Sequence, residues 1–268
     1  MSKVVLITGC STGIGRDLAE WLAQCGYLVV ATARKSETLE SLPAALKLPL
    51  DVTRPASVQQ AVERTLQQFG RIDVLVNNAG FAVRGAIEEV PDEQVQQIFD
   101  VNVFGALRMV RAVVPHMRQQ GSGRIINISS IVGRPAFPIN GVYASTKLAL
   151  EALNDALRLE VADFGIQVVS VEPGAIKTPF DATARIHAQA ILSNPASPYH
   201  NLYQAFMRFM DDTRRRTVGP RVVSEAVQKA IEAPRPKAHY PVAVGFSLRL
   251  FRVLGDSAGE FLLKRMLR

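Results

Sequence analysis

Cysteine and long apolar runs are scarce in this sequence, and each scarcity excludes a class of protein. Cys10 and Cys25 are the only cysteines among 268 residues, so we expect no disulfide framework and interpret both as small buried side chains. No stretch approaches the roughly 20 apolar residues that a membrane-spanning helix requires. The first apolar run, VVLI, is too short for a secretory signal. These features predict a cytoplasmic protein.

Histidine is also scarce, and the positive charge is localised. The four histidines are far apart in the sequence and show no metal-ligand spacing, so we expect no metal-dependent mechanism. Residues 1–180 carry 17 basic and 17 acidic side chains, whereas the remaining residues carry 14 and 7, which accounts for the net charge of +7. Because the only clear basic run is the short RRR at 214–216, we expect no nucleic-acid binding.

The sequence does contain a regular alternation of apolar runs and amphipathic segments. Apolar runs predict strands within 3–8, 27–33, 46–52, 72–80, 123–130 and 166–174. Helical periodicity and cap residues predict helices at 15–26, 55–70, 92–119 and 142–164. Such alternation indicates an α/β fold, a single doubly wound Rossmann-type parallel sheet with helices on both faces. We expect one domain over residues 1–268.

The glycine-rich segment TGCSTGIG, residues 8–15, lies directly behind the first predicted strand. In a doubly wound sheet this turn faces the crevice at the carboxyl ends of the strands, where the next helix offers free N–H groups to an anion. Gly9, Gly13 and Gly15 would let the backbone approach a pyrophosphate closely. Ser11 and Thr12 could add hydroxyl donors. Taken alone, the segment is also compatible with a purely structural turn.

A second motif combines a tyrosine, a lysine and a serine. Tyr143 and Lys147 are four residues apart at the start of a predicted helix, so their side chains share one face. A phenol has a pKa of about 10, and a neighbouring lysine cation would lower it toward the range useful for proton exchange. Ser130 ends a predicted strand and could bind a substrate oxygen beside Tyr143. A solvated helix pair is the alternative for the tyrosine and lysine alone.

Together these motifs identify a family. Over residues ~3–180, and more loosely to the end, the chain resembles the short-chain dehydrogenases/reductases. The matching segments are TGCSTGIG, DV at 51–52, NNAG at 77–80, Asn102, SS at 129–130, YASTK at 143–147 and PGAIKT at 173–178. The segment TGCSTGIG…VVATAR looks most like the 17β-hydroxysteroid dehydrogenase and retinol dehydrogenase-like branch.

The resemblance implies roles for individual residues. Tyr143 would be the general acid in reduction and the base in oxidation, and Ser130 would bind the substrate carbonyl. Lys147 would hold the nicotinamide ribose and lower the pKa of Tyr143, and Asn102, within a long helix, would help bind a water that links Lys147 to solvent. The implied cofactor contacts are Gly9, Ser11, Thr12, Gly13, Ile14, Gly15, Arg34, Asp51, Val52, Asn78, Ala79, Gly80, Tyr143, Lys147, Pro173, Gly174, Ile176 and Thr178. For Asp51, capping a helix is the alternative.

The end of the second predicted strand bears on the choice of cofactor. NAD enzymes of this fold place an acidic residue there, which binds the ribose hydroxyls and repels a 2′-phosphate. Here the position is occupied by Ala33 and is followed by Arg34 and Lys35, and an arginine can bind a phosphate bidentately. NADP is therefore favoured, although Thr12 is not basic as in many NADP enzymes of the family. The alternatives are NAD and a solvated Arg34.

Residues 178–218 are expected to form a helical substrate-binding lobe, as the resemblance implies. Its segment 199–210 carries a broad apolar stripe, which predicts either packing onto the sheet or a lid over a hydrophobic substrate. With Phe137 and Phe180 nearby, the expected substrate is a hydrophobic ketone, aldehyde or alcohol such as a steroid, a retinoid or a long-chain compound. The alternative function is that of an inactive NADP-binding sensor on the same fold.

Two further expectations concern surfaces. The helices at 92–119 and 142–164 are expected to pair in a homodimer, as they usually do in the family. Residues 244–268 combine apolar side chains with Arg249, Arg252 and three further cations. This pattern predicts two basic amphipathic helices that either pack on the substrate lobe or contact an anionic membrane surface weakly and reversibly.

Overall fold

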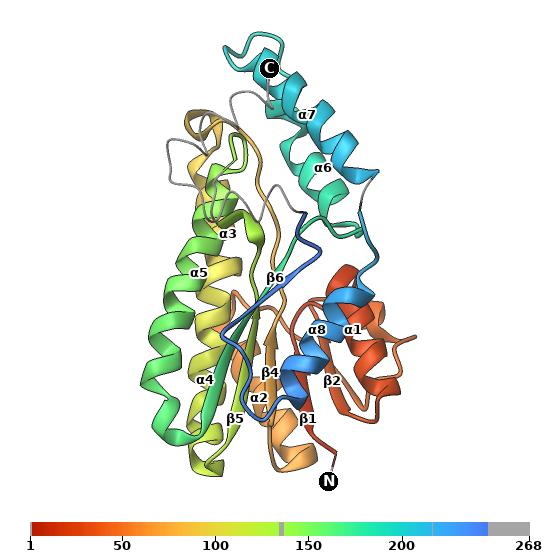
Figure 1. The fold of residues 1–268 in the computed structure, drawn as a ribbon, viewed down its shortest axis with the longest axis vertical. Helices are drawn as coiled ribbons and strands as arrows, with labels where there is room; N and C mark the ends of the chain where they lie inside the picture. Colours follow the sequence, from red (N-terminus) through yellow and green to blue (C-terminus); the bar gives the residue numbers. More distant parts are fainter. Residues whose placement is uncertain (1, 134–136, 216, 246–268) are drawn as a thin grey trace.

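The computed structural model describes residues 2–133, 137–215 and 217–245, and its centre is one parallel β-sheet (Figure 1). The strands are β1 (Val4–Ile7), β2 (Leu28–Ala33), β3 (Leu46–Pro49), β4 (Val74–Asn77), β5 (Gly123–Ile128), β6 (Ile166–Pro173) and β7 (His239–Val242). They lie in the order β3-β2-β1-β4-β5-β6-β7, and every neighbouring pair is parallel. The chain therefore reverses its direction of winding between β1 and β4, where such sheets bind ligands.

Helices cover both faces of the sheet, which confirms the predicted fold class. The helices are α1 (Gly13–Gln24), α2 (Pro55–Phe69), α3 (Asp92–Phe99), α4 (Ala106–Gln120), α5 (Gly141–Glu160), α6 (Phe180–Leu192), α7 (His200–Arg214) and α8 (Arg221–Glu232). Short 3-10 turns are η1 (Ser36–Leu39), η2 (Ile87–Glu89), η4 (Ile131–Gly133) and η5 (Ala162–Phe164). Apolar side chains of α1 and α8 pack on one face of the sheet, and those of α2 and α4 pack on the other.

The helix expected at 92–119 is interrupted. A π-helical turn, η3 (Asp100–Gly105), separates α3 from α4. Within this turn the Asn102 side chain accepts a hydrogen bond from the Phe81 amide and donates one to the Phe81 carbonyl, at 3.0 and 2.9 Å. A π turn widens a helix by one residue and is frequent at functional sites. The apolar pattern could not reveal it, because the pattern continues on both sides.

Helices α6 and α7 pack together beyond the carboxyl ends of the strands (Figure 1). The apolar stripe of 199–210 is their contact: Tyr203 and Phe206 are fully buried against Ala188 and Leu192 of α6. The stripe also reaches the loop residues Ala86 and Ile139, and no sheet strand belongs to this apolar cluster of the described residues. Packing directly onto the sheet is therefore the wrong alternative for this stripe.

The last part of the fold was not predicted. Helix α8 and strand β7 both follow the lobe, and β7 adds to the sheet edge beside β6. Of the expected helices at 244–268, only residues 244–245 fall within the described ranges, so the predicted membrane contact lies outside them. No helix in the described ranges has the length and apolarity needed to cross a membrane. Cys10 is buried as expected, but Cys25 is exposed because it directly follows α1.

A line of hydrogen-bonded polar side chains lies beneath α5. Asn77 of β4 donates to Asn127 of β5 at 2.7 Å, and Asn127 donates in turn to Asn154 of α5. Asn154 donates to the Ser170 hydroxyl of β6 at 2.7 Å, and that hydroxyl donates to Glu151 at 2.8 Å. Because buried polar groups need partners, this line fixes how α5 sits on the strands.

Candidate active site

The glycine-rich turn between β1 and α1 is held in a conformation that only small residues allow. Gly9 has a φ of 74°, and a Cβ on Gly15 would lie 2.3 Å from the Gly9 carbonyl oxygen. The Asn78 side chain fixes the turn by donating to the carbonyls of Thr8 and Gly9 at 2.9 and 3.0 Å. Asn78 thus holds the loop itself, in addition to its expected place beside the adenine.

The turn has the features of a phosphate cradle. Thr12 precedes α1 with extended backbone and makes no side-chain capping bond, so its hydroxyl and the first N–H groups of α1 remain available. Thr178 lies opposite, 3.3 Å from where a Cβ on Gly13 would be. Ser11 and Ile14 are both partly exposed on this turn. The residues present therefore fit a dinucleotide pyrophosphate.

Asp51 and Arg34 lie together at the ends of β2 and β3. Burial would raise the pKa of Asp51, but hydrogen bonds from Thr53 and the charges of Arg34 and Arg54 hold that pKa below its usual range. Arg34 itself is exposed. The N-cap position of α2 is occupied by Arg54, whose side chain makes no capping hydrogen bond. The Asp51 carboxylate instead accepts hydrogen bonds from the amide and the hydroxyl of Thr53. The helix-cap alternative for Asp51 is therefore wrong.

The remaining expected cofactor contacts line the same edge of the sheet. Val52 is buried and packs close to Gly105 of the π turn. Ala79 and Gly80 follow β4, and Pro173 ends β6. The Gly174 amide donates to the Val242 carbonyl of β7 at 2.8 Å, and Ile176 forms a bridge with Val218. Together with the glycine turn after β1 and Arg34 after β2, these contacts lie at the carboxyl ends of five predicted strands, β1, β2, β3, β4 and β6.

Ser130, Tyr143 and Lys147 converge as the spacing predicted. Ser130 follows β5, while Tyr143 and Lys147 lie on successive turns of α5. The Ser130 side chain lies close enough to the Tyr143 phenol to lower its pKa. The Lys147 ammonium lies 5.9 Å from the centre of the Tyr143 ring and donates to the Ile128 carbonyl at 2.8 Å. This arrangement can move a proton at the phenol oxygen of Tyr143.

The pKa of Tyr143 is raised, not lowered as expected from the neighbouring Lys147. Burial raises the pKa of Tyr143 to about 12, and the Ser130 side chain and the charge of Arg84 oppose it only in part. Burial also lowers the pKa of Lys147 to about 8, against the opposite influence of Glu151. Burial thus shifts the protonation equilibria of both groups toward their neutral forms, because desolvation penalises either charge.

Asn102 and Lys147 share the wall of a small cavity. Thr8, Ala79 and Ile128 are among its other lining residues. Besides its bonds to Phe81, Asn102 donates to the Thr146 hydroxyl at 3.1 Å. Such a cavity offers a water molecule the polar partners that it needs. The expected role of Asn102 as a water ligand beside Lys147 is compatible with this geometry.

The two expected substrate-binding aromatics differ in position. Phe180, at the start of α6, is 38% exposed and meets the Tyr143 ring edge-on, with ring centres 5.8 Å apart. Phe137 is buried and stacks on Phe209 of α7 at 6.1 Å. Phe180 therefore lies beside the reactive phenol, whereas the ring of Phe137 supports the helices of the lobe.

Sequence reasoning missed Arg84. This side chain is only 4% exposed, pairs closely with Asp181 of α6 and lies 5.7 Å from the centre of the Phe206 ring. Arg214 of α7 pairs with the same Asp181 carboxylate at 2.8 Å. Arg84 therefore connects both lobe helices to the site and acts on the Tyr143 phenol. Its signal in the sequence was weak, since one arginine four residues beyond NNAG forms no motif.

Lys147 predicts a pH dependence of stability in the cofactor-free protein. The unfolded lysine holds its proton up to about pH 10.4, whereas the folded one releases it near pH 8. Because the unfolded state binds more protons in this window, stability should rise with pH from 8 to 10.4, by about 3 kcal/mol relative to Lys147→Met. Urea unfolding across this range measures the difference.

The matched control is Lys35→Met, because Lys35 is exposed. Its stability should follow the wild type across the window. Parallel curves for wild type and Lys147→Met would show that the folded protein keeps Lys147 charged.

Comparison with known proteins agrees with this geometry. Residues 3–189 match the family model described as short chain dehydrogenase. A 3-ketodihydrosphingosine reductase of Bacteroides thetaiotaomicron is 36% identical over 87% of this chain and 85% of its own length. Human 17-beta-hydroxysteroid dehydrogenase type 1 is 35% identical over 96% and 82%. A crystal structure of a short-chain dehydrogenase from Streptomyces avermitilis superposes with a TM-score of 0.80 at 32% identity, covering 98% of this chain and 95% of that one.

Similar structures with bound cofactor include both nicotinamide dinucleotides. ElxO with NADP bound has a TM-score of 0.73 at 27% identity, covering 90% of this chain and 97% of its own. The 3-ketoacyl-(acyl-carrier-protein) reductase from Brucella melitensis, complexed with NADH, has a TM-score of 0.74 at 27% identity, covering 89% and 96%. The comparisons therefore show a fold that binds nicotinamide dinucleotides, and both NAD and NADP occur among the similar structures.

Proposed function

Because the chain belongs to the short-chain dehydrogenase/reductase family of oxidoreductases acting on CH–OH groups, we propose that it uses NADP(H) to interconvert a hydrophobic ketone or aldehyde and its alcohol. The observation that carries this proposal is the convergence of Ser130, Tyr143 and Lys147 beside the glycine-rich turn. An inactive sensor would have no need for this arrangement.

In the proposed reaction, a nicotinamide held at this site would supply or accept the hydride. Ser130 holds the substrate oxygen, and Tyr143 donates a proton to that oxygen in reduction or removes it in oxidation. Lys147 would hold the nicotinamide ribose. Together with Asn102 and a water in their shared cavity, it would return a proton from solvent to Tyr143. A cation bound beside Tyr143 would lower the raised pKa of this phenol.

The preference for NADP is supported by the end of β2. Ala33 offers no carboxylate to repel a 2′-phosphate, and Arg34 is exposed and close enough to Asp51 to lower its pKa. An exposed guanidinium on the adenine side can bind a phosphate bidentately. NAD is the alternative, since neither residue prevents its binding.

The proposed substrate class is supported by the lobe and by two relatives. Phe180 presents an apolar edge to Tyr143, and α6 and α7 form an apolar cluster above it. The names of the Bacteroides and human relatives indicate a long-chain sphingoid ketone and a steroid. Residues 178–218 would then enclose a hydrophobic substrate, with Arg84 securing the lobe through Asp181.

Replacing Tyr143 with phenylalanine should abolish turnover and leave NADPH binding intact. The change removes the phenolic proton while Lys147 and the glycine turn remain, and a positioned proton donor contributes ~10²–10⁴ in rate. Nicotinamide absorbance with a panel of hydrophobic ketones measures turnover, and fluorescence titration measures binding. Tyr27→Phe is the control, because Tyr27 bonds Glu232 on the surface. Retention of more than about a tenth of kcat would contradict the role of Tyr143.

The double change Ala33→Asp and Arg34→Ala should shift preference from NADP toward NAD. The new carboxylate would repel the 2′-phosphate, and the lost guanidinium removes its partner. The ratio of kcat/KM for the two cofactors measures the shift. Arg54→Ala, which removes an exposed cation that also acts on Asp51, should leave the ratio unchanged. An unaltered ratio in the double variant would place phosphate recognition elsewhere.

We further propose a homodimer that pairs α4 and α5, together with the π turn, across two copies. Phe104, Leu148 and Leu159 of these elements are 50%, 36% and 80% exposed, more apolar surface than a solvated helix pair requires. Leu148→Asp should therefore shift sedimentation from dimer to monomer, whereas Ile186→Asp on α6 should not. A wild-type monomer of 29.3 kDa at all concentrations would contradict the proposal.

A further inference from the structure

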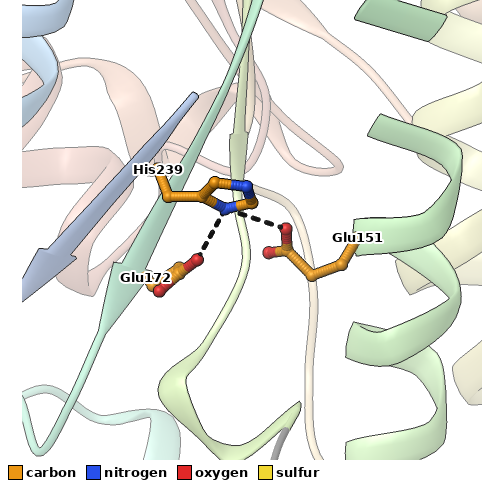
Figure 2. Close-up of side chains that lie close together, drawn as sticks. All are labelled: Glu151, Glu172 and His239. Atoms are coloured by element: carbon orange, nitrogen blue, oxygen red, sulfur yellow. Dashed lines mark hydrogen bonds and ion pairs between the residues drawn. The ribbon is translucent and has the colours of Figure 1, made fainter. Parts of the chain in front are cut away.

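The side chains of Glu151, Glu172 and His239 come together in space (Figure 2). They lie on α5, β6 and β7, so residues far apart in the sequence meet at the sheet edge. Their spacing gave no sign of this, and the histidines were expected to bind no metal. From this geometry we infer that the three side chains form a structural site for one divalent cation of the zinc class.

The ligand atoms have the separations that such a site needs. One ligand atom from each residue lies within 4.8 Å of the others. The Nδ1 atom of His239 is 2.8 Å from Oε1 of Glu172 and 3.6 Å from Oε2 of Glu151. Zinc bonds of about 2.0–2.2 Å in tetrahedral geometry separate their ligand atoms by roughly 3.3 Å. A cation between these atoms therefore needs only small side-chain adjustments.

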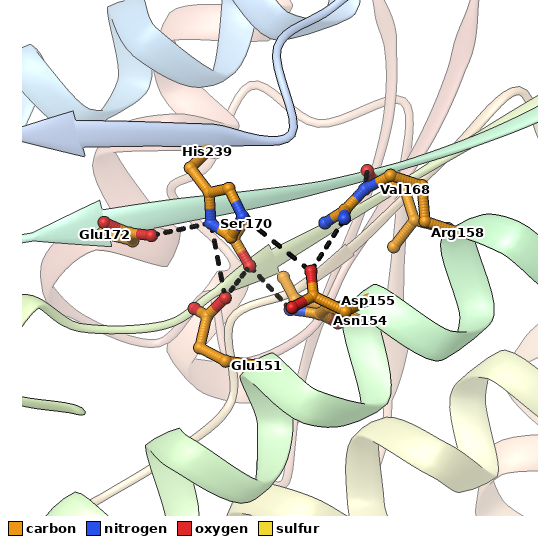
Figure 3. A network of polar contacts seen from close by, with 9 residues as sticks. Glu151, Asn154, Asp155, Arg158, Val168, Ser170, Glu172 and His239 are labelled. Carbon is orange, nitrogen blue, oxygen red and sulfur yellow. Dashed lines mark hydrogen bonds and ion pairs between the residues drawn. The ribbon is translucent and has the colours of Figure 1, made fainter. Parts of the chain in front are cut away.

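The surrounding residues orient the proposed ligands (Figure 3). A metal-bound histidine commonly directs its other ring nitrogen to a carboxylate, and Nε2 of His239 lies 3.8 Å from Asp155. Ser170 holds Oε2 of Glu151 at 2.8 Å. Oε1 of Glu151 is buried and has no hydrogen-bond partner within the described parts of the chain. This carboxylate is thus fixed on one side and available on the other.

The cluster offers the donor atoms that a divalent ion of this class prefers. The carboxylates of Glu151 and Glu172 face the His239 imidazole, and Asp155 lies beside its second ring nitrogen. Two cations also border the cluster: Arg158 pairs with Asp155 at 2.7 Å, and the Lys147 ammonium interacts with Glu151. Imidazole nitrogen and carboxylate oxygen are ligands that zinc takes.

The inferred cation would join three elements that meet the proposed active site. Glu151 follows Lys147 by one helical turn on α5, Glu172 directly precedes Pro173, and His239 begins β7. The ion would hold the last strand and the end of β6 against the helix that carries Tyr143. Its role is structural and does not depend on the proposed reaction.

The test is metal binding by the full chain. After EDTA treatment and dialysis against a slight excess of Zn²⁺, the wild type should retain one equivalent by elemental analysis. Glu151→Gln and His239→Gln should each weaken binding by at least tenfold. His116→Gln, on α4, is the matched control and should bind like the wild type. Co²⁺ substitution should give visible absorption bands that vanish in the two site variants.

A further variant covers the case in which a ligand change prevents folding. Asp155→Asn leaves all three ligands in place and should weaken Zn²⁺ binding by about 10–100-fold through the orientation of His239. Circular dichroism and NADPH binding verify the fold of every variant. Failure of the wild type to retain Zn²⁺, or undiminished binding by the folded site variants, would overturn the inference. Loss of binding in His116→Gln alone would overturn it as well.

Discussion

The parallel pairing of β1 with β4 is the constraint on which the rest of the molecule depends. Val5, Leu6 and Ile7 lie beside Val74, Leu75 and Val76, so the chain must cross the sheet between the third and fourth strands. That crossing separates the turns that follow β1 and β4 and leaves a crevice between them. Asn78 then holds the two turns together through the carbonyls of Thr8 and Gly9. The glycine turn, the lysine and the π turn all face the edge that this pairing creates.

Desolvation sets the chemistry at that edge. The same burial raises the pKa of Tyr143 and lowers that of Lys147, so desolvation works against the charge of both groups. A protonated phenol is a poor base. A cationic ring bound beside it would favour the phenolate more strongly in this buried site than in water. Arg84 already contributes positive charge near the phenol, and its pairing with Asp181 links that charge to the position of α6.

The sequence was informative wherever a local pattern determined the structure. Continuous apolar runs predicted the six strands from β1 to β6, and the glycine turn and the Tyr143–Lys147 spacing predicted side chains that do converge. Strand β7 was missed because its four residues include a proline and show no apolar run. The π turn was missed because Asn102 takes its partners from Phe81, which lies far away in the sequence.

Long-range pairs account for the other omissions. Arg84 finds Asp181, and His239 finds Glu151 and Glu172, only after the sheet has formed. No spacing rule covers such pairs. The lowered pKa expected for Tyr143 failed for a related reason: proximity on a helix was visible in the sequence, but the degree of burial was not.

The polar line beneath α5 has a direction. From Asn77 through Asn127 and Asn154 to Ser170, every amide or hydroxyl donates toward the next strand or helix, and the last acceptor is the Glu151 carboxylate. Turning any one amide around would set donor against donor, so each position requires its neighbours. A chimera that exchanged β5 or β6 with a relative would therefore have to transfer these polar positions as a set, even where the apolar residues matched.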